Sequence, residues 1–356
     1  AAKLRQTRHM TSFLRSDRSK PVAIWVAAVA ALVLGMVILG GATRLTDSGL
    51  SITEWKPVTG VLPPLSAEAW EAEFAKYRAI PEYRLINSDM GLAAFKAIYW
   101  WEWGHRLLAR LAGLVFLAPF AWFAARGKLA GHDLRRLLPM VVLGGAQGVL
   151  GWYMVKSGLS ERVDVSQYRL AAHLGLAFAL YGYVLWVALG YWRGGADAAK
   201  SPLAWWGALL CAAVFLQVLL GALVAGLDAG LTYNTWPLMD GYLAPPGLGS
   251  LSPAYVNVFE NIALVQFNHR WFAGAVLLLA LLVGWRARAQ SPAIRGLAPL
   301  VLAAVAAQFA LGVWTLLMAA SLGLALLHQL GALVLFTAVI ALARLLWNMP
   351  EARRKC

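Results

Sequence analysis

The chain has 356 residues, of which 60% are hydrophobic and 13% are charged, about half of the ~25% charged fraction of an ordinary soluble domain. Its mean hydropathy of +0.64 excludes a soluble globular enzyme and a disordered chain, and predicts an all-α membrane protein with several spans. The formal net charge of +14 does not predict a nucleic-acid partner, because the basic residues lie in short segments between apolar runs, where orientation in membrane lipid explains them. The two cysteines form no C-x-x-C-H motif, which excludes covalent c-type haem and a disulfide framework.

Eight apolar segments are long enough to cross a membrane as helices, since a span needs about 20 residues. The last two come from one run, 296–343, which has no charged residue and would form about 70 Å of continuous helix, roughly twice the thickness of a bilayer. This run must turn back on itself, and we expect the turn near Ser321-Leu322-Gly323. In chain order the predicted spans are 22–42, 105–125, 137–155, 170–192, 203–226, 269–286, 296–318 and 323–343.

The distribution of basic residues predicts the orientation. The segment 44–104 is mildly acidic, and 228–268 has no Lys or Arg. The positive-inside rule therefore places both long connections outside and both termini in the cytoplasm of a bacterium, with the spans in its cytoplasmic (inner) membrane. A signal peptide is excluded, because the first apolar run is too long and no small-residue cleavage site follows it. The basic segments are the N-terminal tail, 126–136, 193–200, 286–295 and the C-terminal tail.

Two copies of a four-span unit follow each other in the chain. Because each copy has an even number of spans, the copies keep the same orientation, and we predict two pseudosymmetric four-helix bundles related by an axis along the membrane normal. The matching residues are Gly40 with Gly221, Asp47-Ser48-Gly49-Leu50 with Asp228-Ala229-Gly230-Leu231, His105-Arg106 with His269-Arg270, Gln147 with Gln308, Gly151 with Gly312, and His173 with His328. The predicted parts are a cytoplasmic tail (1–21), an N-terminal half (22–192), a cytoplasmic linker (193–202), a C-terminal half (203–347) and a second tail (348–356).

Four of the six histidines lie near the outer ends of predicted spans, two in each copy: His105, His173, His269 and His328. Ionisable groups inside spans are costly and are usually functional. Neutral imidazole is a common axial ligand of haem iron, and helices of a four-helix bundle can hold one macrocycle between them. Zinc prefers four clustered nitrogen or sulfur ligands, which two separate histidine pairs do not supply. We therefore predict two haem sites, each with two histidine ligands to iron.

The neighbours of the first histidine in each pair differ between the copies. Arg106 and Arg270 are predicted to hold haem propionates, with snorkelling to the interface as the alternative. Glu102 stands three residues before His105, where the second copy has Gln266, so a carboxylate shares the helix face of an iron ligand in the first half only. Such a carboxylate can move protons or stabilise developing positive charge, and an ion pair at the surface is the alternative.

Three motifs give the chain a family resemblance. Phe95–Arg106 (FKAIYWWEWGHR) resembles the signature of haem A synthases, and so do Gly41–Ser51 (GATRLTDSGLS) and Thr232–Gly241 (TYNTWPLMDG). The resemblance extends over roughly residues 25–345 and implies an eight-helix bundle. It also implies an activity: oxidation of the C8 methyl group of haem O to the formyl group of haem A, by successive hydroxylations, for cytochrome oxidase.

The resemblance implies a role for each histidine pair. His105 and His173, with Glu102, would form the catalytic site that takes haem O as substrate, while His269 and His328 would hold a resident haem b. Haem O synthase and cytochrome oxidase assembly factors are the implied partners, and self-association stays open. The chain lacks the loop cysteine pairs of some members and so resembles the proteobacterial and mitochondrial branch. The residues alone leave one alternative, a di-haem b-type cytochrome that exchanges electrons with quinone.

Overall fold

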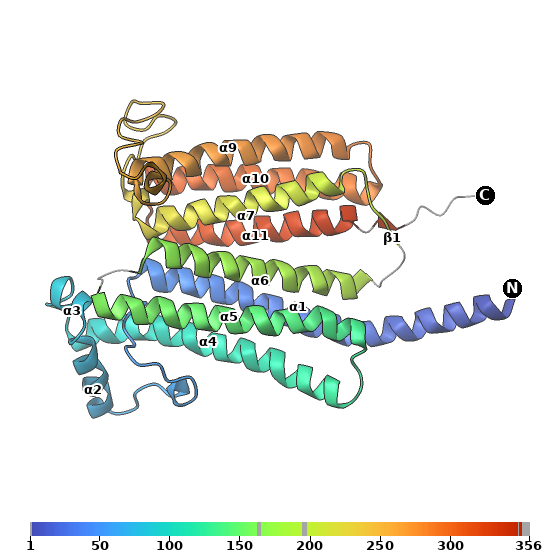
Figure 1. Ribbon diagram of the computed structural model, residues 1–356, viewed down its shortest axis with the longest axis horizontal. Helices are drawn as coiled ribbons and strands as arrows, with labels where there is room; N and C mark the ends of the chain where they lie inside the picture. The colour runs from blue at the N-terminus through green and yellow to red at the C-terminus, as the bar shows by residue number, and fades with distance from the viewer. Residues whose placement is uncertain (1, 162–164, 194–197, 348, 351–356) are drawn as a thin grey trace.

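A bundle of eight long helices dominates the computed structural model, which describes residues 2–161, 165–193, 198–347 and 349–350 (Figure 1). Each of these helices contains a stretch long and apolar enough to cross a membrane, as the sequence predicts. The chain is therefore a multi-pass membrane protein. The helices are α1 (Ala2–Leu45), α4 (Leu92–Ala125), α5 (Gly131–Glu161), α6 (Gln167–Arg193), α7 (Ala204–Gly226), α9 (Ile262–Ala287), α10 (Pro292–Leu317) and α11 (Leu322–Trp347).

Shorter elements lie in the connections. Between α1 and α4 the chain forms η1 (Thr59–Val61), α2 (Ala67–Tyr77) and α3 (Pro81–Leu85); between α7 and α9 it forms η2 (Ala229–Leu231), η3 (Ala254–Val256) and α8 (Asn257–Glu260). At the other end of the bundle, β1 (Ala198–Ala199) pairs antiparallel with β2 (Met349–Pro350). Figure 1 shows both long connections at one end of the bundle, opposite the start of α1 and the end of α11.

Most of the helices extend beyond their predicted spans, and after α1 the largest differences at a helix start occur in α4 and α9. The α4 helix starts at Leu92 rather than at 105, and α9 starts at Ile262 rather than at 269, so the long connections shrink to 46–91 and 227–261. Residues 92–104 include two charged side chains, which are costly in lipid, whereas 262–268 include none. In the structure those charges have partners: Glu102 pairs with Arg106, and the Lys96 ammonium lies 5.1 Å from the Trp70 ring centroid. The α1 helix also extends through the predicted tail, whereas the turn between α10 and α11 lies at 318–321, as expected.

The interior of the bundle consists of α1, α6, α7 and α11. Within their apolar windows 33–50% of the residues are buried, against 6–22% in α4, α5, α9 and α10. Van der Waals packing rather than the hydrophobic effect holds such helices together in lipid, so small residues at close contacts matter. One such contact joins the two halves of the chain: Gly41 of α1 makes room for Gln329 of α11, whose amide donates to the Val37 carbonyl oxygen (2.6 Å).

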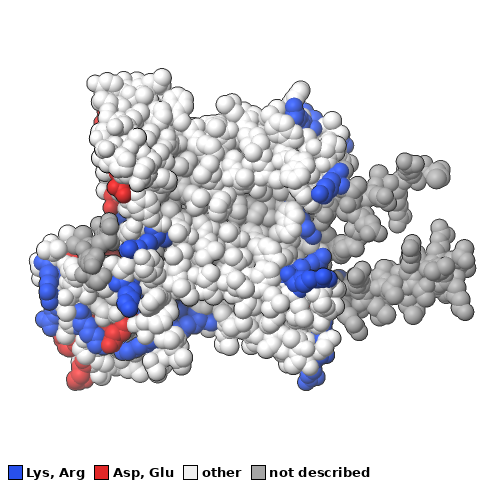
Figure 2. Space-filling model, viewed as in Figure 1, with Lys and Arg blue, Asp and Glu red and all other residues white. Residues whose placement is uncertain are grey.

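The charged residues lie at the two ends of the bundle. Figure 2 shows a broad central band without charge, and on this face Asp and Glu are visible only at the end that carries the long connections. Lys and Arg occur at both ends. This pattern agrees with a bilayer around the central band.

An aromatic cluster fixes the first long connection to α4. Trp70 and Phe74 of α2 lie 5.0 Å, centroid to centroid, from Tyr99 and Phe95 respectively. Tyr77 is fully buried in the same cluster. Aromatic pairs at these separations add about 0.5–1.5 kcal/mol each beyond the area that they bury. The cluster therefore holds the segment after α1 against the first turns of α4, where the candidate site begins.

Candidate functional site

The four predicted iron ligands come together as two pairs. His105 of α4 lies close enough to His173 of α6 to interact with it electrostatically, and so does His269 of α9 with His328 of α11. All four side chains are half-buried. Within the described part of the chain, no three His, Cys, Asp or Glu residues gather into a metal site. The arrangement is thus one of imidazole pairs, as in a haem with two histidine ligands.

Each imidazole lies against a glycine of a neighbouring helix. A methyl group on such a glycine would stand closer to the ring than carbon atoms normally approach, which is about 3.5–4.0 Å. The absent side chain therefore sets the place of the ring, and the same contact occurs in both halves. The pairs are Gly40 with His105, Gly151 with His173, Gly221 with His269 and Gly312 with His328, with distances of 2.8, 3.0, 3.0 and 2.9 Å from the built Cβ to the ring Cε1.

Three of the imidazoles also lie beside a glutamine one helical turn before that glycine. Gln147 Nε2 donates to the His173 carbonyl oxygen (3.1 Å) and lies 3.3 Å from its ring Nε2. Gln217 and Gln308 donate to the carbonyl oxygens of His269 and His328, 3.0 and 2.8 Å away, and each amide nitrogen lies 3.1 Å from the ring Nδ1. Sequence reasoning missed Gln217, although the shared spacing Gln-x-x-x-Gly could have identified it.

Glu102 and Arg106 fasten the segment after α1 to α4. The Glu102 carboxylate is 3% exposed and accepts hydrogen bonds from Ser51 Oγ (2.8 Å), Ile52 N (2.7 Å) and Arg106 Nη2 (2.6 Å). Arg106 also donates to the carbonyl oxygens of Ile52 (2.8 Å) and Glu54 (3.0 Å). Glu102 is therefore ion-paired, but in a buried site and not at the surface. We refer to these contacts as the loop clamp.

The second half has a matching clamp without the carboxylate. Gln266 Nε2 donates to the carbonyl oxygens of Ala229 (2.7 Å) and Thr232 (2.6 Å). Arg270 donates to Gln266 Oε1 (3.0 Å), to the Thr235 carbonyl oxygen (2.9 Å) and to the Tyr233 carbonyl oxygen. An uncharged amide thus fills the place of Glu102. Loop carbonyls engage Arg106 and Arg270, so a propionate would bind their remaining N–H groups. Arg270 Nε is one such group, because it is buried and has no hydrogen-bond partner among the described residues.

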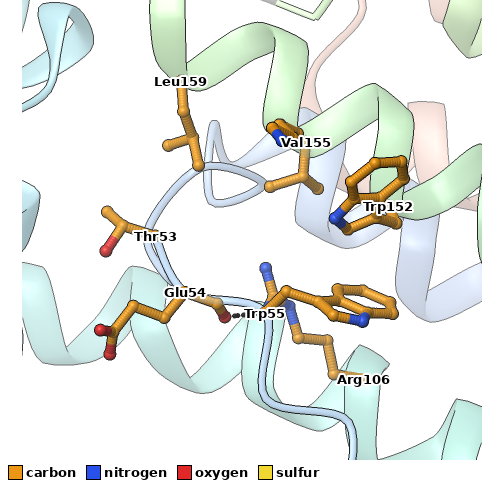
Figure 3. A pocket seen from close by; sticks show the side chains of 8 residues that line it. Thr53, Glu54, Trp55, Arg106, Trp152, Val155 and Leu159 are labelled. Carbon is orange, nitrogen blue, oxygen red and sulfur yellow. Dashed lines mark hydrogen bonds between the residues drawn. The ribbon is translucent and has the colours of Figure 1, made fainter.

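A cavity of about 240 Å³ opens beside the loop clamp of the first half (Figure 3). Trp55 and Trp152 face each other across it, and Arg106 reaches the Glu54 carbonyl below them. Lys156 also lines the cavity, with its ammonium 5.2 Å from the Trp152 ring centroid. Aromatic walls with two cations suit a flat molecule that carries carboxylates. The sequence analysis did not single out Trp152 or Lys156.

A group of ion pairs holds the cavity rim to α2. Lys76 donates to Glu54 (2.7 Å) and Glu73 (2.7 Å), and Lys56 Nζ lies 2.6 Å from a Glu54 carboxylate oxygen. Hydrogen bonds from Lys56 and then Lys76 lower the pKa of Glu54 below its ordinary value of 4.5. The ionised form of Glu54 is therefore the form that the folded connection favours.

Comparison with known proteins identifies the family. The family model described as cytochrome oxidase assembly protein, COX15-CtaA, matches residues 23–340. The chain belongs to this family. A protein from Caulobacter vibrioides named heme A synthase is 50% identical over 338 residues, which cover 94% of this chain and 98% of that protein. Relatives of the same name come from Parvibaculum lavamentivorans (50% over 317 residues, 88% and 91%) and Paracoccus denitrificans (49% over 327 residues, 90% and 86%).

The residues of this family member fit a haem in each half. Each half supplies two imidazoles, each of which lies against a glycine of a neighbouring helix. Within the described chain, the Nδ1 atoms of His105 and His173 and the amide oxygens of Gln147, Gln217 and Gln308 are buried without a hydrogen-bond partner. Buried polar atoms are normally satisfied, and exceptions often mark functional sites. The resemblance to haem A synthases is confirmed; the assignment of individual ligands stays a prediction.

Proposed function

We propose that this chain is a haem A synthase of a bacterial inner membrane, an oxidoreductase that converts the C8 methyl group of haem O to the formyl group of haem A by successive hydroxylations. The observation that carries the proposal is an asymmetry. Both halves have a histidine pair and a loop clamp, but only the first half has a buried carboxylate, Glu102, in the clamp. A di-haem cytochrome that passes electrons to or from quinone would not need this difference.

Under this proposal the first half binds the substrate and the second half holds a resident cofactor. His105 and His173 bind haem O and then haem A, and His269 and His328 hold a resident haem b. When bound, the haem iron supplies the redox chemistry that side chains lack. The cavity supports the assignment of the first half to substrate, because Trp152 and Lys156 correspond to the aliphatic Val313 and Leu317 in the second copy. The proposed partners are a haem O synthase, which supplies the substrate, and factors that assemble cytochrome oxidase.

Glu102 has two tasks in this scheme. It holds Ser51 and Ile52 through hydrogen bonds, which keeps the segment after α1 closed over α4 and excludes water. It also lies one helical turn from His105, where a carboxylate can accept a proton as hydrogen leaves the substrate methyl group. Arg106 Nη2 lies 2.6 Å from Glu102 Oε1, so the two side chains form a buried ion pair.

The variant Glu102→Gln tests the proposal. Gln266 occupies the matching position of the second half, so an amide is compatible with this helix and clamp. We expect haem A formation to fall by at least ~100-fold, because general acid–base groups contribute about 10²–10⁴-fold, while bound haem b stays at the wild-type level. The measurement is chromatography of extracted haem from cells that make haem O, normalised to haem b.

Ser51→Ala separates the two tasks of Glu102. This change removes the hydrogen bond from Ser51 Oγ but keeps the carboxylate. If Glu102 moves a proton, Ser51→Ala keeps most of the haem A yield. An equal loss in both variants would reassign Glu102 to holding the loop. A wild-type haem A yield from Glu102→Gln would overturn the proposed role entirely.

The proposed resident haem has its own test. His269→Ala or His328→Ala removes one ligand of the second pair, and we expect each variant to lose the six-coordinate b-type absorption spectrum after purification. His105→Ala serves as the matched control, since it changes the first pair and should keep that spectrum. A normal six-coordinate spectrum in purified His269→Ala and His328→Ala would contradict the proposal that these two histidines bind the resident haem.

A further inference from the structure

One of the four imidazoles differs from the others in its surroundings. The glycines that contact His173, His269 and His328 each follow a glutamine by four residues, but the glycine that contacts His105, Gly40, follows Met36. Residues four apart share one face of a helix, so Met36 has the place on α1 that Gln217 has on α7. A thioether is at most a weak hydrogen-bond acceptor and donates none. His105 therefore lacks the amide that accompanies its counterpart His269.

The hydrogen bonds of the two pairs reflect this difference. Both Nδ1 atoms of the second pair have an amide nitrogen at 3.1 Å, from Gln217 and Gln308. Neither Nδ1 of the first pair has a hydrogen-bond partner among the described residues, since Gln147 approaches the other nitrogen of His173. The rings of the second pair thus lie against side chains from two further helices, Gln217 of α7 and Gln308 of α10, and the Gln217 amide nitrogen also lies 3.5 Å from Nε2 of His269.

Such contacts govern how firmly a histidine binds metal. Groups that contact a ligating imidazole fix the orientation of its ring and make it a stronger ligand. Gln217 and Gln308 give the second pair this support, because each Nε2 donates to the carbonyl oxygen of its histidine (3.0 and 2.8 Å) and lies against the ring. Loss of such a partner typically lowers metal affinity by about 10–100-fold.

We propose that Met36 keeps the first haem site exchangeable: without an amide at this position His105 is the weaker axial ligand, so haem leaves the first site readily and stays in the second. This inference rests on the proposed function, in which the first site must release each product while the second retains its cofactor. Met36 acts through His105 and is a positioning residue. It sets the lifetime of the bound haem and takes no part in the chemistry.

Haem release can be measured without any enzyme activity. The purified protein is loaded with haem b at both sites, and transfer to excess apomyoglobin is followed by absorbance. We expect two phases from the unmutated protein, and the fast phase belongs to the first site if His105→Ala abolishes it. Met36→Gln should slow the fast phase by about 10–100-fold and leave the slow phase unchanged. The slow phase also reports that the variant is folded.

Two matched variants complete the experiment. Met36→Leu keeps the size and lacks an amide, so it should release haem like the unmutated protein. Gln217→Met makes the reciprocal change and should speed the slow phase by a similar factor. If Met36→Gln still shows two phases and the rate of its fast phase is unchanged, this inference alone is overturned. A single phase from the unmutated protein would overturn both the inference and the two-site proposal.

Discussion

Gly221 shows how a missing side chain can place a proposed metal ligand, His269. Its α-carbon faces the His269 ring so closely that a methyl group would stand 3.0 Å from Cε1. In a helix interior, Gly→Ala is normally favourable by up to ~1 kcal/mol, because alanine loses less backbone entropy. At Gly221 the ring must move instead, and with it the nitrogen proposed to bind iron.

Gly221→Ala should therefore reduce bound haem b without unfolding the protein. We expect about tenfold or greater loss of affinity, the effect of disturbing the support of a metal ligand. The measurement is the reduced-minus-oxidised haem b absorbance per mole of purified protein. Gly274→Ala on α9 is the matched control, because a methyl group there meets nothing within 4 Å. Equal haem content in the two variants would contradict the role of Gly221.

The sequence predicts the two histidine pairs more readily than the residues that contact them. The histidines stand out because a rare ionisable residue recurs in both copies of an apolar chain. Gln217 has no match in the first copy, where Met36 stands, so the comparison of copies passed over it. The clamp contacts of Arg106 are directed at loop carbonyls, which carry no sequence signal at all. The backbone carbonyls that accept these hydrogen bonds can be identified only once the conformation of the loop is known.

At the scale of elements, α2 and the cavity rim depend on exposed ion pairs. The pKa of Glu54 lies below its ordinary value because Lys56 and Lys76 donate hydrogen bonds to its ionised carboxylate. A lowered pKa in the folded state means that this stabilisation is complete above the unfolded value near 4.5. It is lost as the pH falls through the lower, folded value.

Acidification should therefore loosen α2 from the cavity rim. Below about pH 4.5 we expect amide hydrogen exchange in residues 67–77, corrected for the intrinsic rate, to rise about twofold to fivefold, since exposed ion pairs contribute about 0.2–1 kcal/mol. Mass spectrometry of the exchanged peptides measures this. Glu54→Gln removes the titrating group and should show a much flatter dependence. The same pH dependence in both proteins would rule out Glu54 as its cause.

At the scale of the whole molecule, the orientation of the bundle in the membrane can be tested. The end that carries the long connections is proposed to lie outside, with both termini in the cytoplasm. In a Cys356→Ser background, Ser88→Cys lies in the first long connection and Ala289→Cys in the short turn between α9 and α10; both positions are exposed. An impermeant thiol reagent should label Ser88→Cys in whole cells and Ala289→Cys only after lysis. The opposite pattern would reverse the orientation.

The number of spans was predictable, but their arrangement was not. Bilayer thickness sets the length of an apolar helix, so hydropathy alone separates the spans. Which helices lie inside is a different question. The interior α11 and the peripheral α10 have nearly equal mean hydropathy, 2.2 and 2.1, because lipid and protein interior select the same residues. The predicted two-fold axis between the halves stays a prediction.

The contact between Gln329 and α1 has a consequence for the thermodynamics of the molecule. Gln329 directly follows His328, and it donates to the carbonyl of Val37, the neighbour of Met36 and one turn from Gly40. A single hydrogen bond thus connects the neighbour of one proposed ligand, His328, to the helix whose Gly40 lies against another, His105. If haem at one proposed site alters this bond, it also changes the affinity of the other site. Linkage is reciprocal, so the second site returns the same coupling free energy to the first.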